Sequence, residues 1–321
     1  SIDDGKEWRR VNLNMPPVPV HDIEVKNGDL IVATHGRGFW ILDDISPLRQ
    51  YSPELAAKTA HLFKPEPHTR FGYNWWIDYG GGPPSDEKYF FVRNAEAGYT
   101  FYEKGVVNGD RKRDYIDAGD ARPLGVIIYY LLSDQAKEIS LTILDEAGTE
   151  IRSFGKDALP TEQFSKVVAR EYGGSPDAGQ VTAGVGQGLN RFIWDMRYPT
   201  VSQIPGRPPV VINPIAKPGT YQVRLSVDGK SQTQLFELKI NPNETYTRAQ
   251  TDEKGKAWMA LCMQSEKTAQ AILKGIEAKK KAADTAKANP SLSDASAEVA
   301  KVADNFEASM VSTGTTLVQI I

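Results

Sequence analysis

Apolar and polar residues alternate with a period of two through much of the first 240 residues, which is the pattern of half-buried β-strands. The alternation is clearest at residues 138–144, where Ile139, Leu141 and Ile143 are predicted to point inward. Further strands are predicted at residues 8–13, 21–25, 30–34, 39–43, 87–93, 126–132, 150–154, 189–196, 220–227 and 232–240. The chain is therefore expected to be mostly β.

Short Gly-containing turns join several of these strands. The pair Asn27-Gly28 suits the positive φ angles of a hairpin turn, and a turn with Gly36 and Gly38 follows it. Similar turns are predicted at residues 146–148 and 228–230. Because no helical pattern separates the strands of residues 123–243, an antiparallel β-sandwich is expected there, with a poorly patterned insertion at 156–188.

The period changes to about 3.6 after residue 243, which predicts helices. The apolar residues expected on the two helical faces are Trp258, Leu261, Ala269, Ile272 and Ile276, then Val299, Val302, Phe306 and Met310. Pro290, with Ser291 or Ser293, marks the turn between the helices. Residues 244–321 are thus expected to form an antiparallel helical hairpin, with the lysine-rich run 279–287 on its solvated face.

Residues 53–122 form a Pro- and Gly-rich connector with a dense aromatic cluster. The cluster and its neighbouring carboxylate are Phe71, Tyr73, Trp75, Trp76, Asp78 and Tyr79. Sugar rings stack on aromatic side chains while carboxylates accept hydrogen bonds from their hydroxyls, so one interpretation is a carbohydrate platform. The alternative is that the rings pack the connector between its neighbouring domains.

Composition narrows the function classes. The net charge of −3 over 321 residues gives no basic footprint for nucleic acid. The longest uncharged apolar stretch, residues 123–132, is too short to span a membrane. The single cysteine, Cys262, is expected to be a small buried residue. No cofactor is expected.

Metal-binding patterns were sought among the histidines and aspartates. The four histidines, at positions 21, 35, 61 and 68, lack metal-ligand spacing. An acidic stretch, interpreted as a polar loop, lacks the oxygen spacing and central Gly of a calcium loop; its residues are Asp110, Asp114, Asp117 and Asp120. No metal is therefore expected.

The first eight residues match the Asp-box pattern S-x-D-x-G-x-x-W through Ser1, Asp3, Gly5 and Trp8. In such a turn the carboxylate accepts amide hydrogen bonds, the glycine takes a restricted conformation and the tryptophan fills space between blades. The pattern resembles that of sialidases, sortilin-type receptors and related β-propellers. The resemblance concerns fold, because these boxes lie far from the active centre in that family.

A second resemblance runs over residues 29–48, DLIVATHGRGFWILDDISPL, which look like the last propeller blade of bacterial sortilin-like or BNR-repeat glycosyl hydrolase-like proteins. In that group a connector, an Ig-like sandwich and C-terminal helices follow the blade. The resemblance implies a propeller end at residues 1–52, the connector at 53–122, an Ig-like β-sandwich at 123–243 and the helical hairpin at 244–321.

The resemblance assigns no reaction to this segment, so no catalytic residue is expected in it. A sialidase-type site needs an arginine cluster, a tyrosine nucleophile and acids from several blades, and this chain holds about one blade. Asp22, Asp43 and Asp44 are interpreted as turn and strand-end groups. Arg37, in the turn beside His35, packs in the blade or contacts a ligand over its face.

Three functions remain open at this point. The first is a non-catalytic accessory or interaction region that binds protein or polysaccharide. The second is part of an exo-acting glycosyl hydrolase whose active site lies in upstream blades, and the third is a sortilin-like peptide receptor. The resemblance implies export to the periplasm or cell exterior, and any export signal and the remaining blades are expected upstream or on another subunit.

Overall fold

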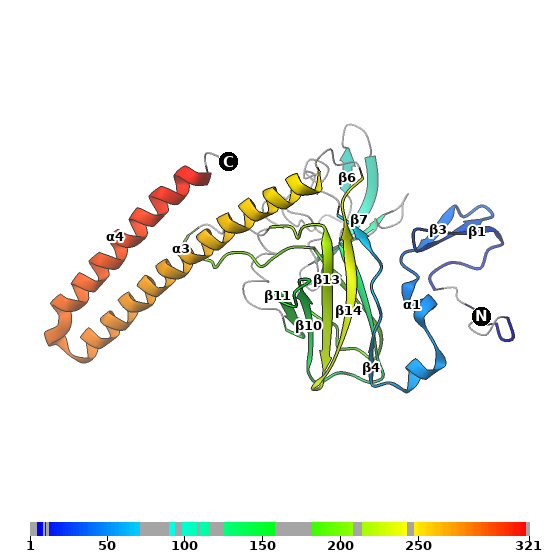
Figure 1. Ribbon diagram of the computed structural model, residues 1–321, viewed down its shortest axis with the longest axis horizontal. Coiled ribbons are helices and arrows are strands. Elements are labelled where there is room, and N and C mark those ends of the chain that lie inside the picture. The colour runs from blue at the N-terminus through cyan, green and yellow to red at the C-terminus, as the bar shows by residue number, and fades with distance from the viewer. Residues whose placement is uncertain are drawn as a thin grey trace. The chain divides into compact units, whose positions relative to one another are not determined.

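The computed structural model describes residues 5–8, 10, 13–70, 90–93, 98–107, 110–115, 125–157, 182–207, 214–242 and 247–318. Within these ranges the chain is mostly β-sheet with three α-helices. It divides into two compact units (Figure 1). The first contains Ser1–Tyr198 and Ala216–Tyr246, and the second contains Pro199–Ile215 and Thr247–Ile321.

The first sheet is a three-stranded antiparallel meander of β1 (Val20–Lys26), β2 (Asp29–Thr34) and β3 (Phe39–Leu42). Asn27 and Gly28 take φ angles of 53° and 85°, which confirms the predicted hairpin turn. Gly36 and Gly38 also have positive φ, as the second turn requires. The helix α1 (Ser46–Gln50) and the 3₁₀ turn η1 (Pro53–Ala57) follow.

The strand predicted at residues 8–13 is not found in its described residues. Trp8 and Arg10 are irregular and Leu13 lies in a turn with a φ of 45°. The side chain of Trp8 is 80% exposed, and its indole lies over Gly5. The local apolar pattern was therefore misleading, because no neighbouring strand pairs with these described residues.

Two further sheets carry the main core of the first unit. One contains β12 (Gly188–Trp194), β9 (Val126–Leu132) and β4 (Ala60–Leu62), in that order. The other has the order β11 (Glu150–Gly155), β10 (Ile139–Leu144), β13 (Gly219–Val227), β14 (Lys230–Lys239) and β5 (His68–Thr69). The predicted strands in these regions are confirmed to within about two residues at each end.

Rings from the two sheets contact one another in the core. Phe154 of β11 lies 4.7 Å from Phe192 of β12, measured between ring centroids. Trp194 of β12 lies 5.7 Å from Tyr221 of β13 and 6.0 Å from Phe236 of β14. Ile139, Leu141 and Ile143 are buried, as the alternation predicted. Burial of these large apolar side chains is the main stabilising contribution to the unit.

The chain from residue 60 to residue 70 joins the two sheets along one side, giving an open half-barrel. Its strand β4 pairs with β9 of one sheet, and β5 pairs in parallel with β14 of the other. Glutamine side chains of β14 span the gap to β4. The Gln232 amide donates to the Ala60 carbonyl at 2.8 Å and accepts from the Leu62 N–H at 3.0 Å. Sequence patterning had placed these residues in the connector.

Replacing Gln232 by alanine is expected to lower the free energy of unfolding by about 1–3 kcal/mol, because the buried Leu62 and the half-buried Ala60 lose the partners of their backbone groups. Urea unfolding followed by fluorescence measures this change. Thr233 is exposed on the same strand, so Thr233→Ala is the matched control and should change stability by less than about 0.5 kcal/mol. Equal effects of the two changes would contradict this role of Gln232.

A fourth sheet arises from residues that were expected to form the connector and a polar loop. It contains β6 (Phe90–Arg93), β7 (Gly98–Val107) and β8 (Asp110–Tyr115), paired antiparallel. Asp110 and Asp114 therefore lie on a strand, which corrects their placement in a loop. The high charge of β8 hid the strand, since alternation of apolar residues is weak there.

The second unit is built on two long helices, α3 (Arg248–Ala288) and α4 (Ser293–Val318), which lie side by side (Figure 1). A capping box at Thr247 and Gln250 begins α3. The 3₁₀ turn η3 (Pro290–Leu292) joins the helices, as the proline predicted. Neither helix, over its described residues, is long and apolar enough to cross a bilayer.

The contact between the helices uses smaller residues than the sequence pattern suggested. Ala269 and Ile272 of α3 are buried, and a Cβ placed at Gly275 would lie only 3.8 Å from the Ala303 Cβ. Val302 is 60% exposed, although the periodicity had grouped it with the inward residues. Trp258 is likewise 41% exposed. The contact therefore combines small side chains with the buried Ile272, while Val302 and Trp258 lie toward solvent.

Candidate functional site

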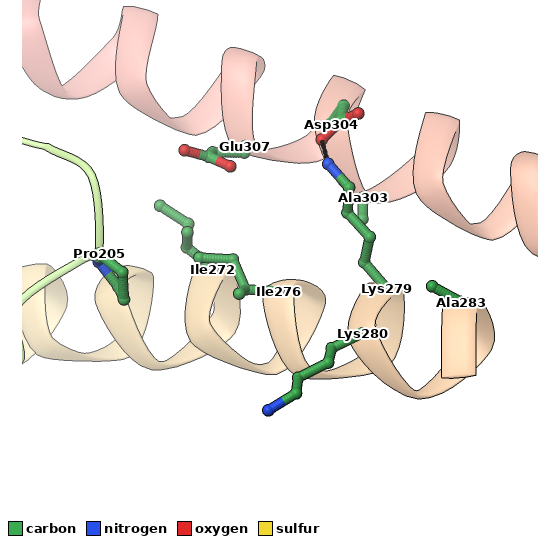
Figure 2. Close-up of a pocket in the computed structure, with 9 residues that line it drawn as sticks. All are labelled: Pro205, Ile272, Ile276, Lys279, Lys280, Ala283, Ala303, Asp304 and Glu307. Carbon is green, nitrogen blue, oxygen red and sulfur yellow. Dashed lines mark hydrogen bonds and ion pairs between the residues drawn. The ribbon is translucent and has the colours of Figure 1, made fainter. Parts of the chain in front are cut away.

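A pocket of about 460 Å³ lies in the second unit, where the segment Pro199–Arg207 meets the two helices. Its lining residues are Pro205, Ile272, Ile276, Lys279, Lys280, Ala283, Ala303, Asp304 and Glu307 (Figure 2). The floor is apolar and the charged residues stand at the rim. Figure 2 shows Lys279 extending from α3 toward Asp304 on α4, whereas Lys280 points away from α4.

Both carboxylates that line this pocket form ion pairs. The Lys279 ammonium lies 2.6 Å from Asp304 Oδ1, and the Arg207 guanidinium lies 2.7 Å from Glu307 Oε1. Arg207 Nε also donates to the same Glu307 oxygen at 2.8 Å. Each pair joins two separate elements of the unit, so the acids are used to hold those elements together.

Glu266 fixes the same segment further along α3. The Ser202 backbone N–H and hydroxyl donate to its two carboxylate oxygens at 2.6 and 2.7 Å. Burial acts to raise the pKa of Glu266, but the hydrogen bonds from Ser202 and Gln270 together lower it below its ordinary value. The carboxylate is thus held ionised as an acceptor, which suits attachment of the segment rather than proton transfer.

The described carboxylates at and near this pocket are engaged in contacts within the helical unit. A general acid or base needs a pKa near the working pH and access to the substrate proton. The carboxylates there are ion-paired or hydrogen-bonded within the unit, and the pKa of Glu266 moves away from neutrality. Across the described ranges, no group of three or more His, Cys, Asp and Glu side chains is arranged to hold a metal ion.

A second polar cluster, which sequence reasoning missed, lies in the first unit. Arg152 on β11 donates to both oxygens of Asp195 at 3.1 and 3.3 Å, and both side chains are largely buried. The Arg152 guanidinium also lies 4.8 Å from the centroid of the Phe154 ring. Burial lowers the pKa of Arg197, with smaller contributions from the nearby charges of Arg70 and Arg152, while Asp195 opposes the shift.

This cluster has no signature in the sequence, because Arg152 and Asp195 are far apart along the chain. Only the pairing of strands brings them together: β11 is in one sheet and β12, which precedes Asp195, is in the other. The Asp195 carboxylate thus accepts hydrogen bonds from the Arg152 guanidinium and from the Arg197 backbone N–H. Its evident role is to hold the two sheets together.

The turn with Arg37 was the sequence-predicted ligand contact in the first sheet. Arg37 is exposed, and its carbonyl accepts a hydrogen bond from the Trp40 indole N–H at 3.1 Å. His35 stacks on His21 with ring centroids 5.1 Å apart. The arginine side chain is therefore accessible, and a ligand contact there stays a prediction.

The three aspartates interpreted as turn and strand-end groups differ in their surroundings. Asp44 is buried with a φ of 50°, and its carboxylate accepts the Ser46 N–H at 3.0 Å. Its own N–H donates to Asp29 at 2.8 Å. Asp22 lies on β1 and accepts the Ile23 N–H at 2.9 Å. Asp43 follows the end of β3, so the two adjacent acids lie beyond the strand and not on it.

Several predicted site residues lie outside the described residues. They are Ser1 and Asp3 of the Asp box, the acidic residues Asp117 and Asp120, and the aromatic cluster Phe71, Tyr73, Trp75, Trp76 and Tyr79 with Asp78. Of the Asp box the structure describes Gly5, with a φ of 87°, and Trp8. The predicted carbohydrate platform therefore stays a prediction.

The single cysteine is buried, as predicted, and is free. Burial raises the pKa of the Cys262 thiol, which makes it a poor nucleophile. In comparisons with known proteins, no protein-family model and no curated protein matches the chain.

Proposed function

We propose that this chain is a non-catalytic accessory and interaction region of an exported β-propeller protein of the sortilin-like, BNR-repeat kind. In this proposal β1–β3 belong to the last propeller blade, the two facing sheets form an Ig-like sandwich, and α3 and α4 form the C-terminal hairpin. The observation that carries it is the distribution of apolar residues on the β1–β3 sheet.

Apolar side chains occupy both faces of this sheet. Residues paired directly across antiparallel strands share a face. The pairing Ile23–Val32–Trp40 defines one face, which continues through Val25, Leu30 and Leu42. The opposite face carries Ile31, Ala33, Phe39 and Ile41 of β2 and β3, with the acids Asp22 and Glu24 of β1 along one edge. A sheet of a two-layer protein needs only one apolar face, so a second one indicates a further layer.

Both faces carry exposed apolar residues on β1 or β3, while the residues of β2 are half-buried. Ile23 on one face and Ile41 on the other are each 60% exposed. Blades of a propeller pack against a neighbour on each side, which is the environment that two apolar faces require. We therefore propose upstream blades, or blades of another subunit, as the partners of this sheet. Binding of protein or polysaccharide by the assembled protein, outside the cell or in the periplasm, is part of the same proposal.

The non-catalytic assignment rests on how the described acids are used. Asp44, Asp195 and Glu266 each accept hydrogen bonds that hold neighbouring segments together. A glycosidase pair needs two carboxyl groups facing one bond with pKa values set apart. The alternative, in which this chain is the accessory part of an exo-acting glycosyl hydrolase, predicts glycoside hydrolysis by the native protein and none by this chain.

The test compares the protein isolated from its native source with this chain alone. Ile23→Ser and Ile41→Ser are each expected to cost the native protein about 2–4 kcal/mol of unfolding free energy, since both side chains are then buried between blades. In this chain alone the same changes should stay within about 0.5 kcal/mol. Thermal unfolding measures both.

Glu24→Gln, at an exposed polar position of β1, is the control substitution that leaves the apolar residues of both faces unchanged. If neither isoleucine change affects the native protein more than the isolated chain, the sheet has no neighbours on its faces. That result would overturn the assignment of β1–β3 to a blade.

A further inference from the structure

One wall of the pocket in the helical unit is a tight turn whose conformation the sequence itself fixes. Pro205 lies in this turn, which is closed by a hydrogen bond of 3.2 Å from the Arg207 N–H to the Ile204 carbonyl. Proline suits the second position of a type II turn, and Gly206 has the positive φ, 78°, that the third position requires. The shape of this wall therefore does not depend on a ligand.

Side-chain contacts on both sides of the turn hold it against the helices. Before the turn, the Ser202 N–H and hydroxyl donate to the Glu266 carboxylate of α3. After the turn, the Arg207 guanidinium pairs with Glu307 of α4 at 2.7 Å. Pro205 thus lies between two attachments, one to each helix. A preformed site of this kind binds a small ligand without the entropic cost of ordering its wall.

The floor of the pocket is aliphatic. Figure 2 shows Ile272 and Ile276 pointing from α3 toward α4, and Ala283 and Ala303 also line the space. A sugar or a peptide would leave hydroxyl or amide groups without partners on these side chains, which is costly. The floor therefore favours an alkyl chain. The volume of about 460 Å³ lies within the range of small-molecule sites.

The charges at the rim do not balance. Lys279 is paired with Asp304 at 2.6 Å, and Arg207 is paired with Glu307. Lys280 also lines the pocket, and no carboxylate of the described residues forms an ion pair with it. The described part of the rim therefore carries one positive charge in excess.

The acids nearest to Lys280 on α3 are engaged with other lysines. Glu277 pairs with Lys281 at 2.7 Å, and Asp284 pairs with Lys287 at 3.3 Å. Because Lys280 points away from α4, its ammonium stands at the α3 edge of the pocket and not between the helices (Figure 2). One ammonium beside an aliphatic floor is complementary to one carboxylate at the end of an alkyl chain.

We propose that this pocket binds an aliphatic monocarboxylate, with its alkyl chain on Ile272 and Ile276 against Pro205 and its carboxylate at Lys280. The site lies wholly within the helical unit. It does not depend on the assignment of β1–β3 to a propeller blade, so either proposal can fail without the other.

The first experiment is a titration of the whole chain with octanoate, followed by NMR of the isoleucine methyl groups. The Ile272 and Ile276 signals are expected to shift with a dissociation constant of about 1 mM or lower. The signal of Ile143, which is buried in the sheet core, should not shift. Octan-1-ol has the same chain without the charge and should bind about threefold more weakly.

Substitutions at the rim test the role of the ammonium. Lys280→Gln should weaken octanoate binding about threefold and leave octan-1-ol binding unchanged. Ala283→Glu places a carboxylate one helical turn from Lys280 and should weaken octanoate binding about tenfold, because it neutralises the ammonium and repels the ligand. Lys274→Gln, at an exposed lysine of α3 outside the lining, is the matched control and should change neither affinity. Far-ultraviolet circular dichroism checks that the helices stay folded.

Four results would overturn the proposal. The first is the absence of Ile272 and Ile276 shifts up to about twenty times the expected dissociation constant. The second is equal affinity for octanoate and octan-1-ol, because the ammonium would then select nothing. The third is octanoate binding that Ala283→Glu leaves intact, which would place the ligand elsewhere. The fourth is tighter binding of an acetylated di-isoleucine peptide, which would make the pocket a peptide site.

Discussion

Replacing Asp195 by alanine is expected to lower the free energy of unfolding of the first unit by about 3–5 kcal/mol. The carboxylate accepts hydrogen bonds from the Arg152 guanidinium and from the Arg197 backbone N–H at 3.1 Å each. Arg70 and Arg197 add positive charge close by. Without Asp195, the largely buried Arg152 loses this carboxylate, and repulsion from the half-buried Arg197 adds to the desolvation cost.

Chemical denaturation of this variant, followed by near-ultraviolet circular dichroism, measures the loss in the sheets. Asp195→Asn keeps the shape and one acceptor oxygen, so an intermediate loss is expected. Asp284→Ala breaks an exposed pair with Lys287 and should cost less than about 1 kcal/mol. If Asp195→Ala costs no more than Asp284→Ala, the buried pair does not hold the two sheets together.

The alternation of apolar residues predicted the strands that have one covered face. In β13 every second residue is buried as expected, because a half-buried strand shows its environment in its own sequence. In β9 and β10 most residues of both faces are buried, and β9 was recognised instead as a short run of apolar and aromatic residues. The Asn27-Gly28 turn was also predictable, since few residue pairs adopt two successive positive φ angles. Neighbouring residues in the sequence were sufficient to predict elements whose conformation depends mainly on those residues.

The strands that the sequence did not reveal are short, charged or held by side chains. β4 spans only Ala60–Leu62, and its edge toward β14 is satisfied by Gln232 and Gln234 instead of a backbone ladder. β8 is rich in charge, so its strand character comes from pairing with β7. Such elements depend on partners distant in sequence, which no local window contains.

Helix periodicity predicted the hairpin but not which face each residue occupies. Val302 and Ala303 are neighbours in the sequence, yet Ala303 lies against α3 and Val302 is exposed. A 3.6-residue period is compatible with either choice when two apolar stripes are present. The contact of Gly275 with Ala303, and not the period, identifies the side of α4 that lies against α3.

The polar contacts of the helical unit were beyond sequence reasoning for a similar reason. Ser202 and Arg207 precede α3 by many residues, and nothing in their surroundings marks them as partners of Glu266 and Glu307. The segment that contains them follows β12 in the chain but belongs to the second unit. Domain boundaries predicted from sequence pattern divide the chain into consecutive segments. The contacts instead assign Pro199–Ile215 to the second unit, although the chain returns to the first unit after it.

Trp194→Ala is expected to lower the free energy of unfolding by about 3–5 kcal/mol. The loss is similar in size to that of Asp195→Ala but has a different mechanism. The indole is fully buried and contacts the rings of Tyr221 and Phe236 in the facing sheet. Its N–H donates to the Arg197 carbonyl at 3.2 Å. Truncation therefore opens a cavity at the centre of the core and removes the donor of a part-buried carbonyl.

Two comparisons separate the cavity from the hydrogen bond. Trp194→Phe retains most of the ring volume and loses the N–H, so it should recover more than half of the stability lost in Trp194→Ala. Trp258→Ala removes a tryptophan that is 41% exposed on α3 and should cost less than about 1.5 kcal/mol. Because Trp194 alone of the two joins facing sheets, a comparable loss from Trp258→Ala would mean that the sheet core does not dominate the stability of the chain.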